Sequence, residues 1–127
     1  MIICSYKYGL VVGNNNITRL TAATFQLGPA GIYQVFFQVS VTEAGQLQIS
    51  LNGVAIANSV VGRNTGTSQI VGMSLIRTTS LNNVLSIINP LGNTPALTIT
   101  PNAGGASAVS AHLVITLLSI TAPPSPA

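Results

Sequence analysis

The chain has 127 residues, enough for one domain of common size, and only 4% of them are charged, against roughly 25% in an ordinary soluble domain. It has no aspartate, Glu43 is its only acidic side chain and His112 is its only histidine. Catalysis by a pair of carboxylates, or by a carboxylate with a histidine of tuned pKa, is therefore not expected, and we expect no enzyme. The remaining charged residues are Lys7, Arg19, Arg63 and Arg77.

The small number of cationic residues limits the kinds of partner that the chain can have. The isoelectric point of about 9.6 does not indicate a nucleic-acid binder, because four scattered cations form no cluster that could neutralise successive phosphates. Every apolar run is interrupted well before the roughly 18 residues that a membrane-spanning helix needs, so no membrane span is expected. Cys4 is the only cysteine, which excludes a disulfide within the chain.

The first half of the chain alternates apolar and polar residues, as strands do. Residues 1–8 are too short for a secretory signal and are expected to be a flexible arm or a remnant. A strand is predicted over 8–13. The clearest strand is predicted over 31–41, where one face consists of Tyr33, Val35, Phe37, Val39 and Val41.

The second half continues the pattern. A strand over 47–51 leads into Asn52-Gly53, which favours a type I′ hairpin, and residues 54–61 are expected to return antiparallel. Residues 121–127 contain three prolines and are predicted to form an extended tail, so that the domain covers 9–120. Further strands, separated by Gly, Pro and Asn clusters, are predicted over 68–77, 84–89, 96–100 and 107–119.

Short strands, frequent turns and no convincing helix predict an all-β antiparallel sandwich or barrel. Several strands are apolar on both sides. Phe36 lies on the face opposite Tyr33 and Phe37, while Val114 and Leu118 lie opposite Leu113 and Ile115. A lone subunit would expose these side chains as a patch of the kind that marks a protein interface, so we expect an obligate oligomer.

One segment resembles a known signature, although the pattern upstream of Phe25 is not matched. Phe25 is followed, after five residues, by Gly31-Ile32-Tyr33-Gln34-Val35-Phe36-Phe37. This resembles the Phe-x5-Gly-x-Tyr-x-Phe-x-aromatic motif of C1q-like domains in the C1q and tumour-necrosis-factor superfamily, with Val35 in place of the middle Phe. The likeness covers roughly residues 9–119. Four further segments resemble the head domains of bacterial collagen-like spore-surface glycoproteins, the BclA-like exosporium group: 47–56, 62–76, 81–90 and 106–118.

The resemblance implies a jelly-roll sandwich that forms a compact homotrimer. It also implies that the strand with the Gly-x-Tyr motif and the last strand face the trimer axis. The residues that it assigns to contacts between subunits are Phe36, Val84, Ile88, His112, Val114 and Leu118. The residues that it leaves in the subunit core are Tyr33, Phe37, Leu85, Ile87, Leu113 and Ile115.

Two features of that superfamily are not expected here. No Gly-x-y repeat precedes the domain, so a collagen-like stalk is not part of this sequence. A calcium site is not expected either, because such sites usually use several carboxylates and only Glu43 is available besides the C-terminus. No cofactor or metal is predicted. His112 is read as a hydrogen-bonded interface residue or an axial stack, with a metal held by three copies as the weaker alternative.

The leading hypothesis is a non-enzymatic trimeric head that drives trimerisation and caps a filament of a surface protein, outside the cell or on the spore surface. The alternative is a recognition module that presents loops such as 62–68 or 92–95 to a carbohydrate or a host receptor. A viral or phage fibre knob is a third reading. Arg19, Arg63 and Arg77 are expected to bond backbone carbonyls, with a ligand surface as the alternative.

Overall fold

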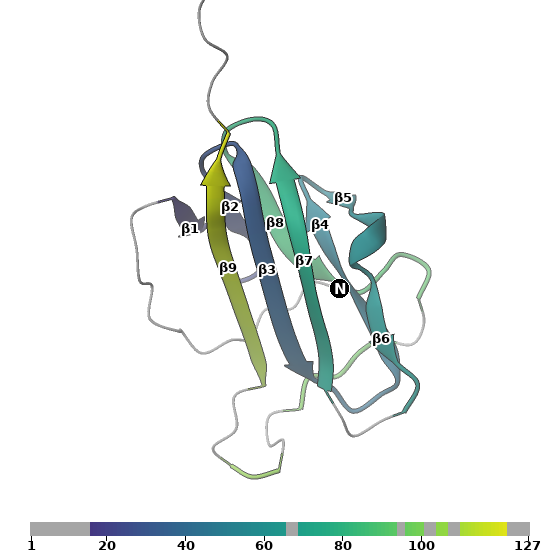
Figure 1. The fold of residues 1–127 in the computed structure, drawn as a ribbon. Helices are drawn as coiled ribbons and strands as arrows, with labels where there is room; N and C mark the ends of the chain where they lie inside the picture. The colour runs from purple at the N-terminus through teal and green to yellow at the C-terminus, as the bar shows by residue number, and fades with distance from the viewer. Residues whose placement is uncertain (1–15, 66–68, 94–95, 101–103, 107–109, 122–127) are drawn as a thin grey trace, which may run out of the picture.

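The computed structural model describes residues 16–65, 69–93, 96–100, 104–106 and 110–121. Two antiparallel sheets lie face to face, so the all-β antiparallel prediction is confirmed (Figure 1). Within the described ranges, no helix is long and apolar enough to cross a membrane. The predicted arm at 1–8, the predicted strand at 8–13 and the tail from 122 onward lie outside the described residues.

The first sheet has three long strands in the order β7-β3-β9. They are β3 (Gly31–Ser40), β7 (Gln69–Thr78) and β9 (Ala111–Ile120), and they correspond to the strands predicted over 31–41, 68–77 and 107–119. Because β3 is the middle strand, its outward side chains are flanked on both sides by those of β7 and β9.

The second sheet is built from shorter strands in the order β1-β2-β8-β4-β5, with β6 also paired to β4. Two of these strands, β4 and β8, correspond to predicted ones, whereas β1 and β2 were not predicted. Each of the latter has only three residues, too few for an alternating pattern to be recognised. The six strands are β1 (Ile17–Arg19), β2 (Phe25–Leu27), β4 (Gly45–Leu51), β5 (Val54–Ala55), β6 (Val61–Arg63) and β8 (Asn83–Ile88).

The turn after β4 forms as predicted, but the returning strand is interrupted. Asn52 and Gly53 have φ values of 53° and 79°, as a type I′ hairpin requires. After β5 the chain forms a short 3₁₀ turn, Ala57–Ser59. There the Ser59 hydroxyl accepts a hydrogen bond from the Ile49 amide at 2.9 Å, in place of a strand carbonyl. The predicted continuous strand over 54–61 is therefore wrong.

The strand predicted over 96–100 is also wrong. This segment runs beside the end of β3 and forms one isolated bridge, between Val41 and Ile99. The Thr98 amide is bound by the carboxylate of Glu43, at 2.8 and 3.1 Å from its two oxygens. The Glu43 side chain therefore accepts the hydrogen bond from the Thr98 amide that a carbonyl of a neighbouring strand would otherwise accept.

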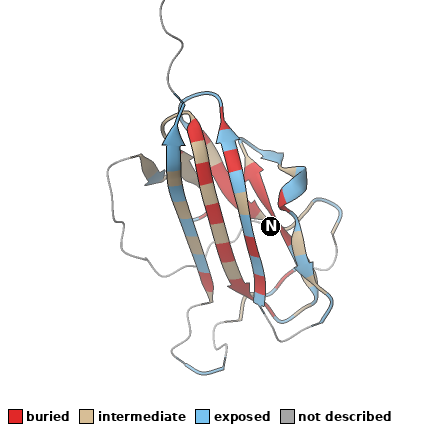
Figure 2. Ribbon diagram, in the orientation of Figure 1, coloured by how far each residue is buried: buried red, intermediate tan, exposed pale blue. Residues whose placement is uncertain are grey.

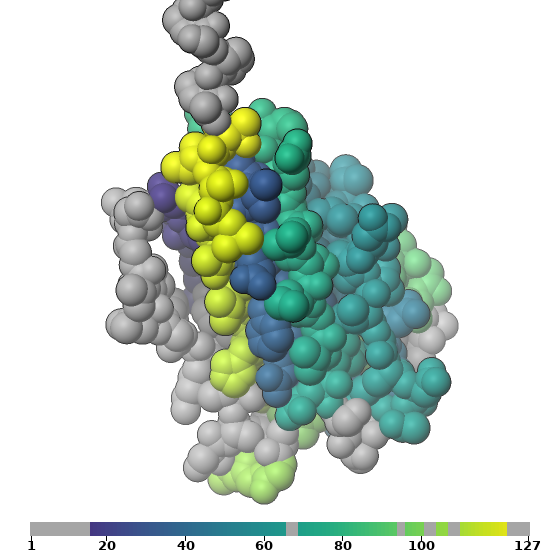
Figure 3. Space-filling view, in the orientation of Figure 1, coloured from purple at the N-terminus to yellow at the C-terminus, as the bar shows by residue number. Residues whose placement is uncertain are grey.

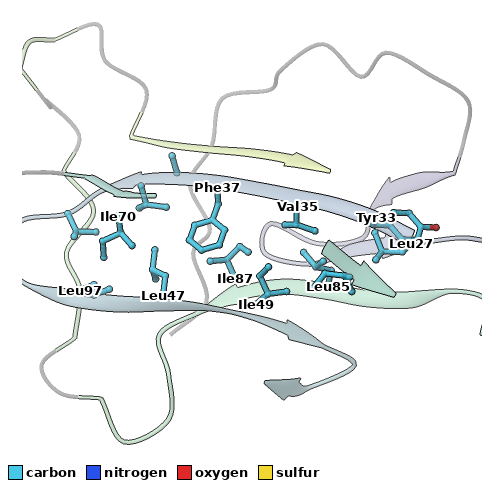
Figure 4. Close-up of a cluster of buried hydrophobic side chains, with 14 residues drawn as sticks. Leu27, Tyr33, Val35, Phe37, Leu47, Ile49, Ile70, Leu85, Ile87 and Leu97 are labelled. Atoms are coloured by element: carbon cyan, nitrogen blue, oxygen red, sulfur yellow. The ribbon is translucent and has the colours of Figure 1, made fainter. Parts of the chain in front are cut away.

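The core lies between the two sheets (Figure 4). Four of the predicted core residues, Tyr33, Phe37, Leu85 and Ile87, belong to its buried cluster. The other two, Leu113 and Ile115 on β9, are partly buried and pack against the cluster. All five apolar side chains of the predicted inward face of 31–41 are buried. Along β3, buried and half-buried residues alternate, as Figure 2 shows.

The Gly-x-Tyr segment has a physical explanation in the packing of β9 on β3. A Cβ atom on Gly31 would overlap the backbone carbonyl oxygen of Ser119, so only glycine fits there. The register between the two strands shifts directly after this point, between Ile32 and Tyr33. The buried Tyr33 hydroxyl donates a hydrogen bond to the Pro29 carbonyl at 2.6 Å, and burial raises the pKa of this phenol.

Candidate functional site

The candidate site is the outer face, which we define as the side chains of β7, β3 and β9 that point away from the second sheet. The strand register arranges them in rows that run across the three strands. The row at the middle of the face is apolar and consists of Met73, Phe36 and Val114. The rows on either side of it are Val71, Gln38 and His112, and Leu75, Gln34 and Thr116. A further row at the end of the sheet holds Arg77, Ile32 and, near the register shift, Leu118.

The apolar side chains of this face are open to solvent. Five of them are between 49% and 67% exposed: Val71, Met73, Leu75, Val114 and Leu118. Phe36, at the centre, is half-buried by its neighbours. In Figure 2, exposed positions recur along β7 and β9, and Figure 3 views the molecule from the side of this sheet. Contiguous apolar exposure of this kind marks an interaction surface or an aggregation hazard.

The structure brings four of the six predicted interface residues to the outer face: Phe36, His112, Val114 and Leu118. The other two, Val84 and Ile88, lie on β8 in the second sheet, so the structure does not bring them to this face. Alternation along a strand indicates which side chains share a side, but it does not say to which sheet the strand belongs. Val84 and Ile88 therefore lie away from the outer face, and their contact with another subunit stays a prediction.

Sequence reasoning missed the contribution of β7. Val71, Met73 and Leu75 point outward, whereas Ile70 and Ile76 point into the core. Both sides of this strand carry large apolar residues, and that pattern was visible in the sequence. Two small inward residues, Gly72 and Ser74, separate the two core isoleucines and make the inward side look the less apolar of the two.

The charged residues of the described segments mostly tie loops together. Arg63 donates hydrogen bonds to the carbonyl oxygens of Glu43 and Val41. Arg19 donates to the Thr21 carbonyl at 2.9 Å. These contacts confirm the expected carbonyl bonding for both arginines. Hydrogen bonds from Thr98 lower the pKa of the Glu43 carboxyl to about 2, because they favour its charged form.

Two cationic or titratable side chains remain on the outer face itself. Arg77 lies at the end of β7, opposite Ile32, and His112 lies on β9, opposite Gln38; both are exposed. Across the described part of the chain, no three histidine, cysteine or acidic residues gather where they could hold a metal. The loops considered for ligand recognition, 62–68 and 92–95, lie partly outside the described residues.

Comparisons with known proteins give no family. No protein-family model matches the chain. No curated protein matches it either.

Proposed function

We propose that this chain is a non-enzymatic assembly domain whose outer face packs against the same face of two further copies. One observation carries the proposal: the middle row of the β7-β3-β9 sheet is apolar, the rows beside it each add one large apolar side chain, and these side chains are largely open to water on the side that the second sheet does not cover. The face carries no acidic side chain among its described residues, so copies of it would attach by apolar contact and by pairing of uncharged polar groups, with the exposed Arg77 and His112 on its two edge strands.

The free energy gained by burying these apolar side chains favours association over leaving them in water. Burying one large apolar side chain is worth about 1.5–3 kcal/mol, so five that are half to two-thirds exposed offer roughly 4–10 kcal/mol per face. In a trimer three such faces are covered, while two association steps are made. The cost of association is about 4–15 kcal/mol in lost rigid-body freedom, which the covered faces can offset.

The number of copies and the biological role rest on the resemblance of residues 25–37 to C1q-like domains. A homotrimer with the jelly-roll topology of that superfamily is the assembly that we propose. In such a trimer the domain holds three chains at high effective concentration and sets their alignment, which is how a head nucleates and caps a filament. A place outside the cell, or on a spore surface, follows from the same resemblance.

The proposal is tested by a pair of matched valine variants. Val114 and Val54 are both exposed strand residues, at 53% and 69%, but only Val114 lies on the outer face. We expect Val114→Lys to convert the wild-type trimer into single chains of 13.0 kDa in light scattering coupled to gel filtration, whereas Val54→Lys leaves the mass unchanged. Equal masses for the two variants would contradict a contact through this face.

A further inference from the structure

Two glutamines occupy the middle strand of the outer face, one on each side of its apolar row. Gln34 and Gln38 lie on β3 on either side of Phe36, and both are half-buried. Gln34 has Leu75 and Thr116 as its cross-strand neighbours, and Gln38 has Val71 and His112. Their positions at the centre of the sheet, rather than at its rim, mean that anything covering the face also covers both amides.

Neither amide has a strong partner among the described residues of its own subunit. The Gln34 amide nitrogen donates to the Met73 sulfur at 3.2 Å, and a thioether is a weak acceptor. The Gln38 side chain makes no hydrogen bond to the part of the chain that the structure describes. On an open surface, water forms the hydrogen bonds that such amide groups need. A covering partner removes that water and must supply donors and acceptors of its own.

We propose that Gln34 and Gln38 pair with polar groups of neighbouring copies and thereby fix the register and the number of chains in the assembly. This inference rests on the proposed function. A carboxamide both donates and accepts, so the same residue on another copy complements it, and the neighbouring Thr116 and His112 of each copy offer further partners. Lipid chains or a purely apolar partner would leave both amides unpaired, which disfavours them as occupants.

The physical basis is the directionality of the two kinds of contact. Apolar rows attract one another in many alignments, because the hydrophobic effect has no preferred direction. Buried amides accept only alignments in which donors meet acceptors. A single buried polar residue specifies register and oligomeric state in coiled coils in the same way, at a cost in stability.

The test removes both amides and keeps their volume. We expect Gln34→Leu, Gln38→Leu to remain associated but to change from one mass to a mixture of several, measured by native mass spectrometry and light scattering. The matched control is Gln26→Leu, Gln46→Leu, which places the same substitutions on the second sheet, and it is expected to keep the single wild-type mass. Because two added leucines raise the risk of precipitation, Gln38→Met is measured in parallel, with the same loss of a single mass expected.

The outcomes separate this inference from the proposed function. A wild-type protein that is a single chain at all concentrations overturns both. A defined wild-type oligomer, with both the Gln38→Met and the double leucine variants showing the same single mass, overturns the role of the amides and leaves assembly through the outer face intact. Wild-type single chains bound to phosphatidylcholine vesicles would identify a lipid surface as the occupant and overturn the inference.

Discussion

The two faces of the β7-β3-β9 sheet are both apolar, yet only one of them is covered by the rest of the subunit. The inner face, with Tyr33, Val35 and Phe37, is buried against the second sheet. The outer face, with Met73 and Leu75, remains open. The inner face therefore forms part of the core of the subunit, and the outer face is the surface that we propose for assembly.

The second sheet shows that an apolar outer face is not a requirement of the fold. Its inward residues, such as Leu47 and Ile49, are as apolar as those of β3. Its outward positions are largely polar instead, with Ser50 of β4 directly opposite Ser86 of β8. Ser50 and Ser86 are themselves buried, at 4% and 9% exposure, so this polar side of the second sheet is covered here, whereas the large apolar side chains of the outer face stay open to water.

The largest expected difference between the two faces comes from the adjacent residues Phe37 and Phe36. Phe37→Ala removes a fully buried ring and is expected to lower the free energy of unfolding by about 3–5 kcal/mol. Phe36→Ala is expected to have only a small effect on the urea midpoint. Its main effect is expected on the assembly, whose mass should decrease on dilution at higher protein concentrations than in the wild type. Urea unfolding at one protein concentration measures the first effect, and light scattering over a dilution series measures the second. Equal losses of unfolding free energy for the two variants would remove the distinction between the faces.

A methyl group added on the inner face has the next largest expected effect. A Cβ on Gly72 would press on the Phe37 ring and lie 2.8 Å from a methyl group of Val61. We expect Gly72→Ala to cost about 1–3 kcal/mol through overpacking, measured by thermal or urea unfolding. Gly105→Ala is the control, because a Cβ there meets nothing within 4 Å. A Gly72→Ala variant as stable as the wild type would show that the inner face is not tightly packed.

On the outer face, a polar substitution is expected to weaken association and spare the fold. Leu75→Ser removes a side chain that is 67% exposed on β7, worth roughly 1–2 kcal/mol per copy when covered. This predicts a dissociation constant raised about 5- to 30-fold, measured by sedimentation or by light scattering on dilution. Leu81→Ser, at a 71% exposed position beyond the end of β7, is expected to leave it unchanged. Identical dissociation constants for both variants would place the contact elsewhere.

The smallest expected effect belongs to neither face but to the loops that Glu43 joins. Its pKa is lowered from 4.5 to about 2 in the folded chain, so its hydrogen bonds to Thr98 contribute fully above about pH 4.5 and are lost as the pH falls towards 2. We expect the urea midpoint to stay level from pH 7 to pH 5 and to decrease below that range. Glu43→Gln is expected to abolish the decrease. A marked loss of stability between pH 7 and pH 5 would point to another group.

Sequence alone predicted what depends on alternation and on turn chemistry. The inward face of 31–41 follows from strict period-two spacing, and the turn at Asn52-Gly53 follows from residues that tolerate positive φ. Side chains that replace backbone partners could not be predicted. Ser59 interrupts the strand after the hairpin, and Glu43 captures the Thr98 amide that would have extended a ladder. Both depend on contacts between residues distant in the sequence.

Part of the candidate site was also predictable from the alternation of apolar and polar residues. Phe36 and Val114 were placed on an outward face by alternation, and the structure puts them side by side on β3 and β9. The assignment of Val84 to the same surface depended on sheet membership, which spacing does not encode. Met73 and Leu75 were overlooked because β7 is apolar on both sides, so that alternation alone did not show which side faces outward.

The mass of the wild-type protein in solution tests the central claim most directly. Light scattering coupled to gel filtration, over a hundredfold range of concentration, is expected to give three times the 13.0 kDa of the chain as a single species. A constant mass of one chain over that range would mean that the outer face stays in water, and would contradict the account.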